Sequence, residues 1–258
     1  MLYVAVRAAR KAGDLIARSF EDTSSFKVQE KQDRDFVTDV DCKAEELILR
    51  EIKRHYPDHG IVAEESGSSN PNASIQWYID PLDGTTNFIH GFPHFAVSIA
   101  AWQDGRPLLA VVYDPIKNEM FEAKRGGGAF MNRRRLRVSP VEYTENAIFA
   151  SGLPPYRRTE LIDVFQQRMD RCMRQTEGYR RAGSAALDLA YTAAGRVDAY
   201  WEGGLCAWDI AAGILLVQEA GGMVTDLDGK AVSLDDGNIL CANSRLHGQF
   251  VRLLQVPS

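Results

Sequence analysis

One stretch of the chain, residues 77–88, constrains the fold more than any other because it carries two carboxylates from an apolar strand into a turn. It reads Trp77-Tyr78-Ile79-Asp80-Pro81-Leu82-Asp83-Gly84-Thr85-Thr86-Asn87-Phe88. Pro81 has a fixed φ and disfavours the helical conformation for the residue before it, so Asp80 is expected to stay extended at the strand end. Asp80 and Asp83 can then converge at one edge of a sheet.

The residues after Asp83 favour the binding of an anion. Gly84 allows the backbone to approach a ligand closely, since it has no Cβ. Thr85 and Thr86 are typical of the start of a helical turn, whose free N–H groups bind phosphate. An anion site next to paired carboxylates requires cations between the two.

Three more acids occupy comparable positions in the sequence. Glu64 ends a predicted strand over residues 61–63, Asp41 precedes a predicted helix, and Asp209 lies in the first turn of a helix over residues 208–220. Two ionised carboxylates about 4 Å apart repel by roughly 4 kcal/mol at a protein-like dielectric, so such a cluster requires protons or a metal. Oxygen ligands without His or Cys indicate Mg²⁺ or Mn²⁺ rather than zinc.

Each acid taken alone also has an ordinary structural interpretation. Asp41 and Asp209 can stabilise helix N-termini, an effect of about 0.3–1 kcal/mol. Asp80 and Asp83 can belong to a turn without any ligand. Glu64 and Glu65 can be two solvent-exposed residues of a loop. The metal interpretation therefore depends on the whole set of acids.

Composition excludes several classes of protein. Of the 258 residues, 45% are hydrophobic and 25% charged, which is the mix of a globular protein with a large core. The 30 Lys and Arg residues against 35 Asp and Glu residues give a net charge of −5, which argues against a mainly electrostatic binder of nucleic acid or membranes. The cysteines show no spacing of a disulfide framework or zinc site: Cys42, Cys172, Cys206, Cys241. A cytoplasmic location without a signal peptide or membrane span is expected.

The pattern of elements changes along the chain. Strands over residues 95–102 and 107–113 flank Asp104-Gly105, a hairpin signal that predicts antiparallel sheet in the first half. Residues 1–20 carry apolar residues at helical spacing and are predicted to form a helix. Residues 24–34 are polar and are predicted to form a loop or mobile flap. In the second half, predicted helices alternate with short strands. We therefore expect an N-terminal α+β subdomain over residues 1–142 and a C-terminal α/β subdomain over residues 143–258.

Taken together, these motifs resemble the inositol monophosphatase family of Mg²⁺-dependent, lithium-sensitive phosphatases. Three blocks carry the resemblance: residues 64–67 (Glu-Glu-Ser-Gly), residues 80–88, and residues 208–213 (Trp-Asp-Ile-Ala-Ala-Gly). Further segments look most like the bacterial SuhB-type branch: 7–13, 111–115 and 183–190. The resemblance implies a layered α-β-α-β-α sandwich, the fold shared with fructose-1,6-bisphosphatase, and commonly a homodimer.

The resemblance also implies which residues hold the metal. The side chains of Glu64, Asp80, Asp83 and Asp209 would be ligands, and the carbonyl of Leu82 would complete the first site. Two or three Mg²⁺ ions per subunit are expected, with Mn²⁺ as a substitute.

Other matched residues are implied to handle the water and the substrate. Thr85 would work with Asp41, beside Glu64, to orient and activate the attacking water. Substrate contacts would come from both halves of the chain: the Gly84 and Thr85 amides to phosphate, Asp83 and Asp209 beside it, and Glu202 with the Ala185 backbone to polyol hydroxyls.

The function implied is Mg²⁺-dependent hydrolysis of phosphate monoesters by metal-activated water, with myo-inositol monophosphate as the expected substrate. Relatives acting on fructose 1,6-bisphosphate, phosphoadenosine phosphate, histidinol phosphate or NADP leave the choice of substrate open. An alternative belongs to another class, because some relatives in the SuhB-type branch take part in transcription antitermination. The chain could then bind the transcription elongation machinery with or without turnover.

The run from Arg133 to Arg137 is the most basic segment of the chain. A solvated hairpin is favoured over contact with RNA or an acidic protein, because no aromatic residues interrupt the run. Arg133 departs from the family, which usually has Gly after the Asn at this position, and this leaves the turn type open.

Overall fold

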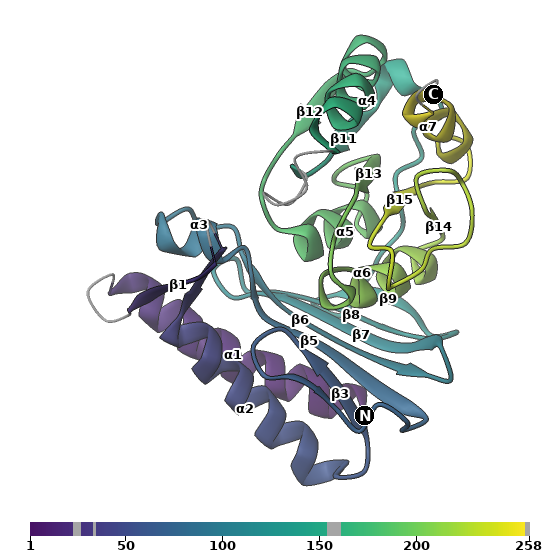
Figure 1. Ribbon diagram of the computed structural model, residues 1–258. Coiled ribbons are helices and arrows are strands. Elements are labelled where there is room, and N and C mark those ends of the chain that lie inside the picture. Colours follow the sequence, from purple (N-terminus) through teal and green to yellow (C-terminus); the bar gives the residue numbers. More distant parts are fainter. Residues whose placement is uncertain (23–26, 33–34, 154–160, 256–258) are drawn as a thin grey trace.

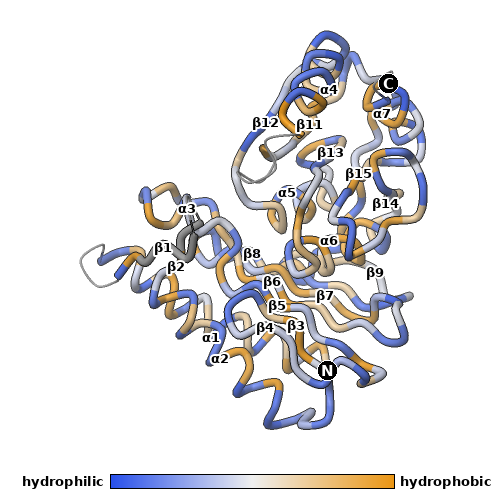
Figure 2. Tube along the Cα trace, viewed as in Figure 1, coloured by the Kyte–Doolittle hydropathy of each residue, from blue (hydrophilic) through white to orange (hydrophobic). Residues whose placement is uncertain are grey.

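The computed structural model describes residues 1–22, 27–32, 35–153 and 161–255 (Figure 1). Two sheets and three helical layers alternate in the order α-β-α-β-α, as the sequence predicted. Figure 2 shows hydrophobic residues concentrated in the strands and on the helix faces turned toward them. Burial of these faces between layers is the main stabilising contribution to the fold.

The larger sheet has eight strands in the order β10-β9-β8-β7-β6-β5-β3-β4. Its strands are antiparallel to their neighbours except for the parallel pair β3 and β5. The bounds are β3 Gly60–Ala63, β4 Gly67–Ser69, β5 Ile75–Asp83, β6 Ala96–Gln103, β7 Arg106–Asp114, β8 Glu119–Lys124, β9 Gly128–Met131 and β10 Arg134–Arg135.

Two long helices, α1 (Leu2–Glu21) and α2 (Asp39–His55), cover one face of the larger sheet (Figure 1). Both are amphipathic, with small and aliphatic residues such as Ala8, Ala12 and Ile48 fully buried against the strands. The capping residue of α2 is Thr38, whose hydroxyl accepts a hydrogen bond from the Val40 N–H. Helix α1 confirms the helix expected from the sequence of residues 1–20.

A second helical layer, α5 (Ala185–Ala193) and α6 (Ala207–Glu219), lies between the two sheets (Figure 1). Every residue from Ile210 to Val217 is buried, because α6 contacts apolar surfaces on both sides. Gly213 permits close approach of the two helices: a Cβ at this position would lie 2.3 Å from Leu189 Cδ1.

The smaller sheet has five strands in the order β12-β11-β13-β15-β14, and α4 and α7 cover its outer face. A short 3₁₀ turn, η1 (Thr144–Asn146), leads into it. The bounds are β11 Ile148–Ala150, β12 Gly178–Arg180, β13 Ala199–Glu202, β14 Met223–Thr225, β15 Ile239–Ala242, α4 Ile162–Gln175 and α7 His247–Leu254. The chain thus leaves the larger sheet after β10 and enters the smaller one at β11. On this path we propose a division into subdomains 1–142 and 143–258.

Two local predictions have different outcomes. The hairpin between β6 and β7 turns at Asp104 and Gly105, with φ angles of 50° and 72°, as the sequence predicted. The predicted loop over residues 24–34 is wrong in part, because β1 (Val28–Gln32) pairs antiparallel with β2 (Asp35–Thr38). Strand β1 consists mainly of polar residues. Its sequence therefore lacks the alternation of apolar and polar residues that would predict a strand. Residues 24–26 and 33–34 of that prediction lie outside the described residues.

None of the helices within the described ranges has the length and apolar character needed to span a membrane.

Two helical glycines provide a test of the packing between the sheets. Gly213→Ala should lower the free energy of unfolding by about 1–3 kcal/mol, because the new methyl group meets Leu189. Gly248→Ala in α7 should raise it by up to about 1 kcal/mol, because Ala favours the helix and its Cβ would lie 3.9 Å from the nearest atom, Arg252 Nη1. Urea unfolding followed by circular dichroism measures the free energy of unfolding of both variants. Equal effects of the two substitutions would contradict the close packing of Gly213 against Leu189.

Candidate active site

The end of β5 presents the first pair of acids. The strand continues past Asp80 to Asp83, although the sequence analysis ended it at Asp80, because β5 still pairs with β6 through Asp83 and Ala96. The register shifts between Asp80 and Asp83, and the Leu82 N–H donates to Asp80 Oδ1 over 2.9 Å. This local irregularity turns both acids toward the same end of the sheet.

Gly84 begins the short helix α3 (Thr85–Ile89), as the sequence predicted. Its φ is 97°, a conformation that favours glycine. A Cβ here would lie 3.1 Å from the His94 carbonyl oxygen and 3.2 Å from that of Gly183. The turn after Asp83 therefore requires glycine for both its backbone angle and its close approach to neighbouring chain.

Glu64 reaches the end of β5 because β3 runs parallel to it. Ala63 pairs with Ile79, and the Glu64 N–H donates to the Ile79 carbonyl over 3.1 Å. The Glu64 carboxyl group also shares a hydrogen bond with the Asp80 carboxyl group. Two acids separated by a polar loop in the sequence thus lie side by side.

Asp209 comes from the other half of the chain, in the first turn of α6. Its Oδ2 accepts a hydrogen bond from the Cys206 N–H over 2.7 Å, so it does cap the helix. Its pKa is raised well above the ordinary value, first by burial and then by the charges of Asp83 and Glu64. Asp209 therefore caps α6 and also lies close to Asp83 and Glu64.

The pKa values of these acids are raised by burial and, for Asp80 and Asp209, also by the charges of the other acids. Burial raises the pKa of Asp80 well above its ordinary value, and the charges of Glu64, Asp83 and Asp209 raise it further. Burial raises the pKa of Asp83 to about 6, against hydrogen bonds from Ser184 Oγ at 2.5 Å and the Ala186 N–H at 2.7 Å. The structure brings these acids together, and their negative charges oppose one another.

Asp41 and Thr85 form a second polar pair beside the cluster. Asp41 is buried in the first turn of α2, where it accepts a hydrogen bond from the Thr38 N–H over 2.9 Å. The Thr85 hydroxyl lies 3.0 Å from Asp41 Oδ1 and 3.1 Å from the Leu82 carbonyl oxygen. Burial raises the pKa of Asp41, while its hydrogen bonds lower it. Asp41 thus caps α2 and also holds Thr85.

A cavity of about 160 Å³ opens next to the cluster. Ala185 and Glu202 line it together with Asp83 and Asp209. Burial raises the pKa of Glu202 to about 7, and the hydrogen bond from the Tyr200 hydroxyl at 2.7 Å opposes that rise. The two residues predicted to contact polyol hydroxyls therefore share this cavity with two of the predicted metal ligands, Asp83 and Asp209.

Two further residues of this site, Ser184 and Asp188, were not predicted from the sequence. Ser184 donates to Asp83, but before a predicted helix a serine indicates only a cap, and Ser184 is also the cap of α5. Asp188 lines the cavity and is buried on α5, where its pKa is raised well above the ordinary value, chiefly by burial. The feature of the sequence that could have revealed Asp188 is an acidic residue within an otherwise apolar helical segment.

The donor chemistry fits a hard divalent cation. The groups that converge are carboxylate oxygens and the carbonyl of Leu82, which suit Mg²⁺ or Mn²⁺. Across the residues that the structure describes, no three His, Cys, Asp or Glu side chains stand as a set already arranged around one metal position. Asp83 and Asp209 accept backbone and hydroxyl hydrogen bonds, and the Asp80 carboxyl group shares a hydrogen bond with Glu64.

Comparison with known proteins agrees with this geometry. The sequence profile of the Inositol monophosphatase family matches residues 1–256. The Nus factor SuhB of Pseudomonas aeruginosa is 49% identical over 99% of this chain and 96% of its own length, and that of Escherichia coli is 49% identical over 95% and 92%.

Solved structures show the same arrangement. The extragenic suppressor protein suhB of Bartonella henselae has a TM-score of 0.95 and 41% identity, covering 99% of this chain and 98% of its own. The inositol monophosphatase of Anabaena has a TM-score of 0.88 and 39% identity, covering 99% and 96%. Fold and site define a phosphatase of the layered α-β-α-β-α class. The chain belongs to the inositol monophosphatase family.

The repulsion within the cluster can be measured through stability. Without divalent cations, Asp80→Asn should raise the free energy of unfolding at neutral pH by on the order of 1 kcal/mol, since one pKa unit corresponds to about 1.4 kcal/mol. Adding Mg²⁺ should raise the Tm of the wild type more than that of the variant. Thermal unfolding with chelator or Mg²⁺ measures both effects. Asp58→Asn, at an exposed position, is the control. It should change neither the free energy of unfolding nor the rise of Tm on addition of Mg²⁺.

Proposed function

We propose that this protein hydrolyses phosphate monoesters with Mg²⁺ as cofactor, and that myo-inositol monophosphate is its substrate. The observation that carries the proposal is the convergence of Glu64, Asp80, Asp83 and Asp209 beside the Gly84 turn, where Asp80 is buried and the other three acids are half-buried. Such a concentration of negative charge is unfavourable unless cations neutralise it. Membership in the inositol monophosphatase family supports the same chemistry.

These acids and the carbonyl of Leu82 would hold two or three Mg²⁺ ions, for which Mn²⁺ could substitute. Bound divalent ions supply neutralisation of the phosphate oxygens and a lowered pKa for water in in-line phosphoryl transfer. The protein supplies placement, because the sheet fixes Asp80 and Glu64 while α6 fixes Asp209. Hydrolysis by metal-activated water would require no phosphorylated enzyme intermediate.

Thr85 and Asp41 would orient the attacking water, beside Glu64. The Thr85 hydroxyl donates to Asp41, which leaves its oxygen lone pairs able to accept a hydrogen bond from water. The amides of Gly84 and Thr85 lie at the start of α3 and would hold phosphate oxygens, with Asp83 and Asp209 next to the ester. Reacting groups held in this way need less reorganisation during the reaction.

Glu202 and the backbone of Ala185 would select the alcohol part of the substrate. A carboxylate accepts hydrogen bonds from vicinal hydroxyls, and Glu202 lies in the same cavity as Asp83 and Asp209. A polyol phosphate thus suits the cavity. We further propose that the protein acts as a cytoplasmic homodimer.

A substrate panel tests this function. With Mg²⁺, the wild type should hydrolyse inositol monophosphate faster than sugar bisphosphates or nucleotide phosphates, and lithium should inhibit it. Asp83→Asn should lower the rate more than about 100-fold, because loss of one charged ligand removes several kcal/mol of transition-state stabilisation. Phosphate release measures the rate, and circular dichroism shows that the variant is folded.

The exposed Asp58→Asn variant should keep wild-type activity. Full activity of Asp83→Asn would contradict the mechanism. A preference for a bisphosphate nucleotide would contradict only the choice of substrate.

A second function has separate support from the comparisons. Relatives named Nus factor SuhB are 46–49% identical over 95–99% of this chain. We propose that the chain also binds transcription elongation machinery, in a role in antitermination and ribosomal RNA processing. This function needs a surface and not turnover, so the two functions can coexist in one protein.

A binding assay separates the two functions. The tagged full chain should retain RNA polymerase with its Nus factors from purified components, and Asp83→Asn should retain them equally because Asp83 is only partly exposed and lines the cavity beside the cluster. Quantitative immunoblotting of the retained subunits measures the result. Absence of retention by the wild type would remove the antitermination role, whatever the outcome of the phosphatase assay.

A further inference from the structure

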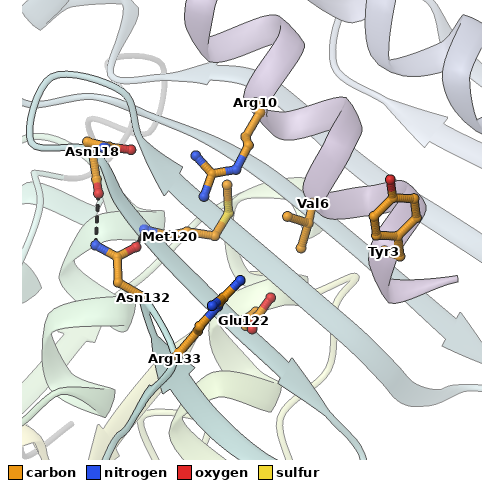
Figure 3. A pocket seen from close by; sticks show the side chains of 8 residues that line it. All are labelled: Tyr3, Val6, Arg10, Asn118, Met120, Glu122, Asn132 and Arg133. Atoms are coloured by element: carbon orange, nitrogen blue, oxygen red, sulfur yellow. Dashed lines mark hydrogen bonds between the residues drawn. The ribbon is translucent and has the colours of Figure 1, made fainter.

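A second and larger cavity lies on the opposite side of the larger sheet from α6. Its volume is about 510 Å³, and its walls include Tyr3, Val6 and Arg10 of α1, Met120 and Glu122 of β8, and Arg133 (Figure 3). It shares no lining residue with the cavity beside the acid cluster. Nothing in the proposed hydrolysis uses these side chains.

The cavity exists because the first helical layer is narrower than the sheet. Helix α1 packs mainly on β6 and β7 and makes only slight contact with β8. Met120 is buried at the margin of this contact, whereas Glu122, two residues further along β8, lies on the same face beyond it. The uncovered part of β8 thus forms the floor of a crevice beside α1.

Hydrogen bonds fix the far wall of the cavity. The Asn132 side chain accepts from the Met120 N–H over 3.0 Å. It also donates to the Asn118 carbonyl over 2.9 Å (Figure 3). The Tyr113 hydroxyl lies 3.1 Å from Asn118 Oδ1. These contacts hold the turn between β9 and β10 against β8, so the wall is formed in advance of any ligand.

Arg133 occupies a backbone conformation that usually belongs to glycine. Asn132 and Arg133 have φ angles of 47° and 69°, and the turn joins the paired strands β9 and β10. Asparagine followed by glycine is the preferred sequence for such a turn. An arginine here strains the backbone and places a guanidinium group at the cavity. Strained residues of this kind concentrate at ligand sites.

Arg10 and Arg133 face this cavity without a carboxylate partner. Among the described residues, neither guanidinium group takes part in a salt bridge, although Arg10 lies over the Tyr113 ring with its Cζ 5.6 Å from the ring centroid. Arg196, by contrast, forms a bidentate pair with Glu119. Two cations from separate elements therefore remain available on one concave surface.

We propose that this cavity binds a small organic anion, with its phosphate or carboxylate group between Arg10 and Arg133. A guanidinium group binds either anion through parallel hydrogen bonds. Val6 and Met120 offer an apolar wall, and the exposed ring of Tyr3 offers a flat surface for the body of the ligand. Glu122 disfavours a second anionic group and can accept a hydroxyl or amine hydrogen. The volume is that of a small-molecule site.

Isothermal titration with phenylphosphonate in the presence of a metal chelator tests the proposal. This probe carries the anion and an apolar ring and cannot be hydrolysed as an ester. The wild-type chain should bind it, and Arg133→Gly and Arg10→Gln should each weaken binding at least about tenfold, as loss of a charge-assisted hydrogen bond predicts. Benzoate and inorganic phosphate, titrated in parallel, distinguish a carboxylate site from a phosphate site and measure the contribution of the ring.

The variants separate binding from folding. Arg133→Gly should show a Tm equal to or above that of the wild type, because glycine relieves the backbone strain. Arg134→Gln removes the same charge from an adjacent, exposed residue that does not line the cavity and should leave binding unchanged. Absence of binding, or equal weakening by Arg134→Gln, would overturn the proposal. So would a change of oligomeric state in Arg133→Gly, which would show that a second copy fills the cavity.

Discussion

The mutual repulsion of the carboxylates at the end of β5 is the constraint that packing in the rest of the structure has to offset. Asp80 receives the negative fields of Glu64, Asp83 and Asp209 in a setting from which water is largely excluded. A fold tolerates such an arrangement only when packing elsewhere is strong enough to hold it. The buried layer of α5 and α6 between two sheets provides that packing, and it carries Asp209 and Ser184 to the cluster.

Local chemistry in the sequence revealed much of the fold and of the site. The Asp80-to-Thr85 segment, the Asp104-Gly105 hairpin and the amphipathic α1 each follow from rules that act within a few residues. Convergence in space does not follow from such rules. Nothing local shows that Asp209 meets Asp80, and recognition of the set depended on resemblance to a known family.

Other parts escaped prediction for different physical reasons. Strand β1 is polar and is held by backbone pairing, so its side chains carry no strand signal. Ser184 looked like a helix cap and is one, yet the same hydroxyl also serves Asp83. The basic run was interpreted as a solvated hairpin. That holds for the exposed Arg134 and Arg135 of β10, whereas Arg133 also lines a cavity.

The position of Asp209 on α6 has a consequence for how the protein is made. During translation, the strands and turn that carry Glu64, Asp80 and Asp83 leave the ribosome well before α6 does. Until α6 inserts between the sheets, the emerging chain holds an incomplete cluster of acids, and its apolar sheet face is uncovered. Completion of the acid cluster and closure of the hydrophobic core are thus the same late event in biosynthesis.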